Sequence, residues 1–362
     1  SHGVLRLVIT LAGEYISNID PNIGFLHRGS ERLLQERSLQ ACAVFYDRLD
    51  YTSVLTQTHS YCITVESMLY SNHTSLSTRR FRTVLDELSR ILNHLLSIAT
   101  HALDIGTMAT LFWAFEERER IMEIFEYISG ARMHVALYVP GQELQTLQTD
   151  VFILKTVLLL KNLQKAITEI YITLYNNRVW RLRLTGVGVI TARSGILCGI
   201  SGPVLRSTGI PHDLRILNLC NYGVYNNINT TIYVANMGDS FDRFLIRIRE
   251  LYNSSYIIYQ ILAELDMYNN TYVNNSIRFK LQSLITLFSV IGGDDRASSG
   301  IYTGFVEAGK GEFGTTIIAN DTNKPYRVYI RSPAFNHLQI LPLLAHGHQI
   351  ADIATLLGTL DI

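Results

Sequence analysis

Five polar residues stand in segments that are otherwise apolar or turning, and their side chains can hold charge, hold protons or donate hydrogen bonds. His2 lies at the mouth of a first predicted strand, and Arg28 lies in a turn that enters a helix. Tyr51 ends a charged turn, Asp104 closes a long apolar helix, and His134 ends a short glycine-containing segment. If buried, such charges must be paired or functional, because an unpaired buried charge is very costly. Their spacing alone leaves two interpretations open, an internal ion-pair network or a site for proton and ligand chemistry.

Metal chemistry has weaker support in the sequence. His94 and His101 are seven residues apart on one predicted helix face and could hold a metal, although such histidines more often line a helix–helix contact. The cysteines are scattered, with no Cys-x-x-Cys pair, so the sequence predicts reduced, buried thiols and no metal site built by this chain alone. They are Cys42, Cys62, Cys198 and Cys220.

Nucleotide-binding motifs are incomplete. Gly186-Val187-Gly188 lacks the third glycine and the helix start of a dinucleotide site. Gly309-Lys310-Gly311 lacks the upstream glycine and the Lys-Ser/Thr ending of a P-loop.

Charge is balanced and sparse. With 31 basic and 31 acidic residues the net charge is zero, so no global field favours nucleic acid or an anionic membrane surface. Charged residues make up 17%, against about 25% in typical soluble domains, which fits either a large core or permanent coverage by other subunits. The most apolar long segment, Val151 to Tyr175, contains three lysines, whereas a membrane span needs roughly 20 apolar residues with few charges. We therefore expect no membrane span.

The elements that must position the five residues follow from periodicity. Two strands, Val4 to Ile9 and the weaker Glu14 to Ile16, predict a β-hairpin. Apolar residues at spacings of three and four predict long helices near 81–98, 111–128, 151–178 and 239–266. We also expect a strand at 186–190, alternating strands in 302–331 and a helix over 338–357. The fold class is α+β, divided into an N-terminal β element (1–40), a helical bundle (41–290) and a C-terminal β/α extension (291–362).

Nine short segments occur in an order and spacing that closely resembles the quinone-site core subunits of respiratory complex I in their mitochondrial form. The resemblance runs over almost the whole chain, from His2 to Asp361. The segments are His2 to Leu7, His27 to Gly29, Asp47 to Tyr51, Thr100 to Gly106, Phe115 to Glu119, Gly130 to His134, Ser201 to Pro203, Gly209 to Arg215 and Lys310 to Gly314.

The resemblance implies a fold similar to the large subunit of nickel–iron hydrogenases, from which this family is thought to descend. Hydrogenases hold their metals with two Cys-x-x-Cys pairs, and both are missing here, so hydrogenase chemistry is excluded. What the resemblance implies instead is a chamber for ubiquinone as substrate. A [4Fe-4S] cluster held by a partner subunit would supply the electrons, and this chain alone would bind no cofactor.

The site residues come from the same resemblance. Tyr51 and His2 match the family's two hydrogen-bond donors to the quinone headgroup, and Asp104 matches the aspartate that pairs with that histidine. Arg28 and His134 match residues beside the partner-held cluster, where a cation or hydrogen bond raises the cluster's potential. Some segments depart from the family, such as Val139 to Gln142, where Arg-Pro-Gly-Gly is usual, but the five residues are untouched.

The resemblance also implies partners and a location. The partners are other complex I core subunits: the cluster-bearing small subunit, adjacent peripheral-arm subunits and the membrane-arm subunit of the quinone channel. The location is the matrix side of the mitochondrial inner membrane. Two alternatives stay open, the equivalent subunit of the ferredoxin-dependent chloroplast or cyanobacterial relative, and a scaffold subunit that has lost its site.

Overall fold

The computed structural model describes residues 5–69, 74–141, 144, 150–217, 222–268 and 297–362. Helices dominate, with a two-stranded hairpin near the N-terminus and a three-stranded sheet in the C-terminal part. The α+β fold class, with its helical bundle, hairpin and C-terminal extension, is therefore confirmed. The proposed division at residues 40 and 290 stays a prediction.

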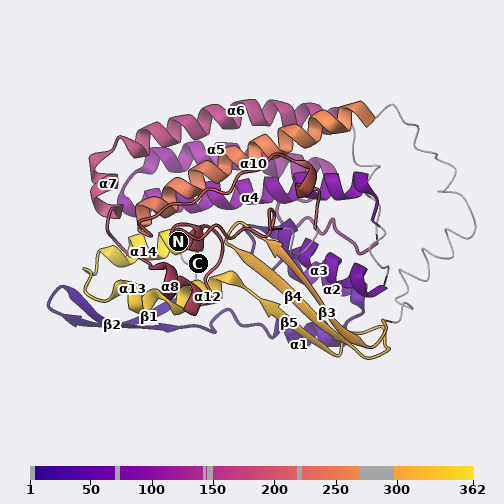
Figure 1. Ribbon diagram of the computed structural model, residues 1–362, viewed down its shortest axis with the longest axis horizontal. Coiled ribbons are helices and arrows are strands. Elements are labelled where there is room, and N and C mark those ends of the chain that lie inside the picture. The colour runs from indigo at the N-terminus through magenta and orange to yellow at the C-terminus, as the bar shows by residue number, and fades with distance from the viewer. Residues whose placement is uncertain (1–4, 70–73, 142–143, 145–149, 218–221, 269–296) are drawn as a thin grey trace, which may run out of the picture.

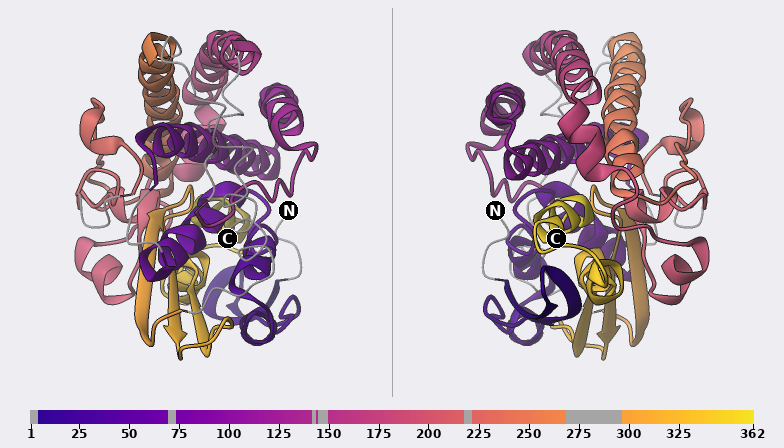
Figure 2. Two further views of the ribbon diagram at one scale, coloured as in Figure 1. Left: turned by 90° about the vertical axis from the view of Figure 1, so that its right-hand side faces the viewer. Right: turned by 90° about the vertical axis from the view of Figure 1, so that its left-hand side faces the viewer.

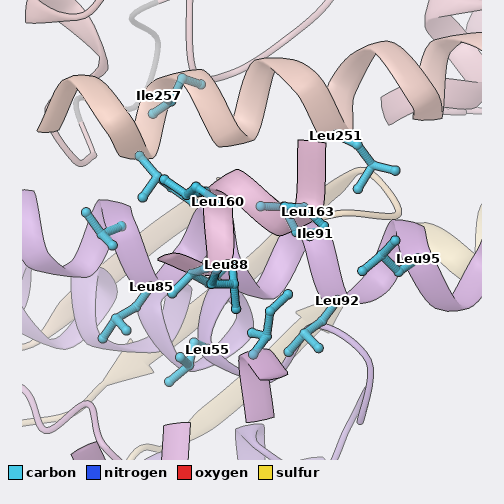
Figure 3. Packing of buried hydrophobic residues seen from close by; sticks show 14 of the residues in the cluster. Leu55, Leu85, Leu88, Ile91, Leu92, Leu95, Leu160, Leu163, Leu251 and Ile257 are labelled. Carbon is cyan, nitrogen blue, oxygen red and sulfur yellow. The ribbon is translucent and has the colours of Figure 1, made fainter. Parts of the chain in front are cut away.

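The bundle consists of long helices that lie side by side in Figure 1. Helix α4 (Leu76–Ile105) is its central member and contacts α5 (Met108–Ser129) and α10 (Ser240–Tyr268), while α6 (Asp150–Tyr175) packs on α5 and α10. Ser75 caps α4 by accepting a hydrogen bond from the backbone N–H of Thr78, and Gly106 ends it at a positive φ. Because its apolar residues recur every three or four positions, α4 buries them against its neighbours, as Figure 3 shows for Leu85, Leu88 and Ile91.

A second layer lies below the bundle in Figure 1. On one side, α1 (Ser30–Glu36), α2 (Leu39–Tyr46) and α3 (Val54–Leu69) pack with the antiparallel sheet β3 (Gly300–Glu307), β4 (Glu312–Ala319) and β5 (Arg327–Arg331). On the other, β1 (Arg6–Ala12) and β2 (Tyr15–Asn22) pair antiparallel beside the C-terminal helices. These are α12 (Pro333–Gln339), α13 (Leu341–Ala345) and α14 (Asp352–Leu360).

The remaining short elements connect these layers. They are α7 (Arg178–Leu184), α8 (Ala192–Leu197), α9 (Gly202–Arg206) and a 3-10 turn, Tyr225–Asn227. The two end-on views of Figure 2 place the C-terminus centrally, between the bundle and the second layer.

Two local predictions were wrong. Residues 186–190 form no strand, because Gly186 and Gly188 have φ of 74° and 64°, and their backbone bonds to the loop before α10 instead. The predicted helix over 338–357 is three short helices, since Pro342 begins a new one and Gly347, at φ 80°, reverses the chain before α14. The second strand of the hairpin, predicted as weak, is a full strand of eight residues.

Candidate functional site

Tyr51 lies in the turn that joins α2 to α3, and the carboxylate of Asp47 fixes the start of that turn. Asp47 is fully buried; it accepts hydrogen bonds from the hydroxyl of Thr58 on α3 and, at 2.5 Å, from the backbone N–H of Ala136. Burial raises the pKa of Asp47 although both hydrogen bonds favour the carboxylate. The turn is therefore held against α3 and against the segment that follows α5.

Two of the sequence-predicted residues bind the backbone of this same turn. Arg28 donates from Nη2 to the carbonyl oxygen of Arg48 at 3.0 Å, and His134 Nδ1 lies 2.9 Å from the carbonyl oxygen of Asp47. Because a carbonyl can only accept, His134 donates from Nδ1. The structure thus gathers Arg28, Tyr51 and His134, which are 106 residues apart at their extremes, around one turn.

A small hollow opens beside Tyr51. The turn, α4, α5 and the segment before His134 all contribute to its wall, which is mostly apolar with two guanidinium groups. Its lining residues include Tyr51, Thr52, Leu92, Arg118, Met122, Arg132 and Met133. The ring of Tyr51 is 56% exposed, so its phenol is available to a ligand.

Arg118 is a member of the hollow that the sequence did not single out. Its side chain is buried to 8% exposure, its guanidinium lies 5.6 Å from the ring centre of Phe115, and its Nε has no hydrogen-bond partner among the described residues. Burial lowers the pKa of Arg118, and Tyr51 is the first group whose charge would oppose that shift. The spacing of Arg118, Met122 and Phe125, three and four apart, is the only sequence signal that could have placed them on one face.

The other two predicted residues are not brought to this hollow by the described part of the chain. Asp104 is exposed in the last turn of α4, about 18 Å along that helix from Leu92 at 1.5 Å per residue. His2 lies outside the described residues. The predicted pairing of Asp104 with His2 therefore stays a prediction.

The histidines of α4 are in helix contacts. His94 Nε2 lies 2.9 Å from a carboxylate oxygen of Glu250 on α10, and the His101 ring packs 4.9 Å from that of Trp180 on α7. The helix–helix interpretation of His94 and His101 is therefore confirmed.

The next feature is the placement of side chains that could bind a metal. In the parts of the chain that the structure describes, no three His, Cys, Asp or Glu side chains cluster as metal ligands. Cys42 and Cys62 are buried, and burial raises the pKa of the Cys42 thiol to about 11.

Within the same described residues, no helix has an apolar stretch long enough to cross a bilayer.

Comparisons with known proteins all identify the same family. Residues 104–362 match the family described as "Respiratory-chain NADH dehydrogenase, 49 Kd subunit". Over its full length the chain is 56% identical to the NADH-ubiquinone oxidoreductase 49 kDa subunit of Nyctotherus ovalis, across 89% of that protein. It is 40% identical to the protein of the same name from Paramecium tetraurelia, across 95% of it, and 39% identical to that of Acanthamoeba castellanii, across 91% of it.

Proposed function

Because the chain belongs to the 49 kDa subunit family of respiratory-chain NADH dehydrogenase, complex I, we propose that it forms the chamber in which this enzyme reduces ubiquinone. The observation that carries the proposal is the hollow at Tyr51. An exposed phenol there shares a mostly apolar wall with the buried guanidinium of Arg118, so a hydrogen-bond donor and a cation lie beside apolar surface.

The chemistry explains why a phenol serves there. Reduction of a quinone to a quinol takes two electrons and two protons, one at each carbonyl oxygen, so hydrogen-bond donors must reach both. Tyr51 would donate to one oxygen and His2 to the other, with Asp104 orienting the imidazole of His2. Arg118 would stabilise negative charge that develops on the phenol or the quinone oxygen.

Electrons would come from a [4Fe-4S] cluster of the small partner subunit, beside Arg28 and His134. Both residues are fixed by backbone carbonyls of the Asp47–Tyr51 turn, so the cluster-facing and quinone-facing groups share one support. Neither would be a cluster ligand; each would favour the reduced cluster by its charge or hydrogen bond.

Membership of the family makes the chain a subunit of NADH-ubiquinone oxidoreductase, and other complex I subunits are its partners. Beyond that, we propose contacts with the cluster-bearing small subunit, neighbouring peripheral-arm subunits and the membrane-arm subunit of the quinone channel. The proposed location is the matrix side of the mitochondrial inner membrane.

Tyr51→Phe in the assembled complex tests the proposal. We expect a loss of quinone reduction of at least tenfold, since the variant keeps the ring and removes the donor, about 1.4 kcal/mol or more of transition-state stabilisation. Tyr329→Phe on β5 is a matched control, because its ring is 55% exposed and it lies away from the hollow. NADH:ubiquinone reductase activity sensitive to quinone-site inhibitors is the measurement.

The two alternatives predict different results. Unchanged, inhibitor-sensitive turnover in Tyr51→Phe would contradict the chamber and favour a scaffold. Turnover with reduced ferredoxin and none with NADH would favour the ferredoxin-dependent relative.

A further inference from the structure

A chain of four polar side chains runs under the turn that carries Tyr51. Thr52 Oγ1 lies 2.7 Å from Asp50 Oδ1 and 2.6 Å from Asn93 Oδ1, and Asn93 Nδ2 lies 2.8 Å from Asp361 Oδ2. The chain joins the turn to the middle of α4 and to the residue that follows α14. Thr52 and Asn93 are 7% and 1% exposed, so water can replace few of these contacts.

The amide of Asn93 sets the direction of this chain. Its nitrogen donates to Asp361, so its oxygen accepts from the hydroxyl of Thr52.

The same chain flanks Tyr51 on both sides. Asp50 precedes it and Thr52 follows it, and Asp50 also accepts from the backbone N–H of Thr52 at 3.1 Å and pairs with Lys310 at 3.4 Å. The backbone on either side of Tyr51 is thus fixed while its ring stays exposed.

We propose that Asp50, Thr52, Asn93 and Asp361 together position Tyr51 for the quinone. The proposal rests on the function proposed above and deepens it, because it assigns the support of the donor rather than the donor itself. None of the four is a catalytic residue; they act through the turn.

The charges that face the two carboxyl groups decide in which direction hydrogen bonds are donated along these four side chains. Lys310 faces both Asp50 and Asp361, and Arg247 and His94 of the bundle face Asp361. Although burial alone would raise it, Lys310 and Arg247 hold the pKa of Asp361 below its usual value. The direction in which Asn93 donates to Asp361 and Thr52 donates to Asn93 is therefore favoured.

Positioning is tested with Thr52→Val in the whole complex. The substitution keeps the side-chain shape and removes the hydroxyl from both of its contacts. We expect the KM for a short-chain ubiquinone to rise about fivefold or more, as for a lost buried hydrogen bond, while electron transfer to an artificial acceptor upstream of the quinone is retained. Thr52→Ser keeps the hydroxyl and should restore the low KM. A KM in Thr52→Val equal to that of the unmodified complex would overturn the proposal.

The outcomes also separate this inference from the chamber itself. If Tyr51→Phe abolishes quinone reduction and Thr52→Val changes nothing, only the positioning chain is wrong. If Tyr51→Phe turns over normally, the chamber is wrong at this residue.

Discussion

Backbone carbonyls, rather than carboxylates, hold two of the predicted site residues, Arg28 and His134. Arg28 binds the carbonyl of Arg48 and His134 that of Asp47. A search of the sequence for charge pairs would have missed both contacts, since main-chain groups carry no sequence signature. Resemblance to a family marked Arg28 and His134, but only the fold shows that one turn holds them both.

This geometry predicts what His134 does to a neighbouring cluster. Because Nδ1 donates to a carbonyl, the ring has a fixed orientation, so its loss should remove one favourable group beside the reduced cluster. We expect His134→Phe to lower the midpoint potential of the partner-held cluster in an electron paramagnetic resonance titration of the complex. His346→Phe, in the exposed loop after α13, is the control. An unchanged potential in His134→Phe would place the cluster elsewhere.

The long helices were predictable because each follows a single period over many turns. The pattern of Phe81, Leu85, Leu88 and Leu92 predicts the middle of α4, residues 81–98, although the helix runs from Leu76 to Ile105. Residues 186–190 were read as a strand because they are short, apolar and flanked by glycine. The conformation of that segment depends on a contact that is distant in the sequence, since a side chain at Gly188 would meet Leu356 of α14 at 2.3 Å. Such tertiary constraints do not appear in local periodicity.

Between the bundle and the sheet lies a buried network of opposite charges that local patterns also could not show. Arg206 of α9 is at its centre, donating to Glu250 of α10 at 2.7 Å and to Glu307 of β3 at 2.8 Å. Further members are Glu87, Arg90, His94, Asp213 and Arg215. The four carboxyl groups outnumber the three guanidinium groups, so neutrality requires a proton on a carboxyl group or on His94.

The two glutamates that bind Arg206 should respond differently to neutralisation. Burial raises the pKa of Glu307, whereas Arg206 and His94, against the effect of burial, hold that of Glu250 well below its usual value. We expect Glu307→Gln to be tolerated and Glu250→Gln to lose about 3–5 kcal/mol by leaving a buried cation short of a partner. The yield and melting temperature of the complex measure this.

The direction of the Glu307 shift also fixes a pH dependence. A carboxyl group whose pKa is raised by folding contributes stability at low pH and loses it as pH rises through its folded-state pKa. As pH rises above 4.5, the ordinary pKa of a glutamate, the melting temperature of Glu307→Gln should therefore fall less than that of the unmodified complex. A larger fall would mean that Glu307 is ionised in the fold.

At the scale of the whole molecule, the sequence predicts candidate site residues but not the residues that line the hollow. The hollow at Tyr51 is built from a turn, two helices and the segment before His134, and only the packing of the bundle brings these together. Asp104 lies further along α4, outside the hollow, and its role stays a prediction. The low share of charged residues, by contrast, was read directly from composition and matches the large apolar side chains left exposed on the surface.

That exposed apolar surface predicts where partners cover the molecule. On α5, Met108, Phe112 and Phe115 recur at spacings of four and three and are 59%, 64% and 39% exposed, so they form an apolar stripe facing away from the core. A charge there cannot disturb the interior but would be very costly beneath a partner. We expect Phe112→Glu to reduce the amount of assembled complex on native gels severalfold, whereas Lys324→Glu, in the exposed turn before β5, should not. Normal assembly of Phe112→Glu would mean that this face of α5 stays in contact with water in the complex, and the low charge of the chain would then reflect its core alone.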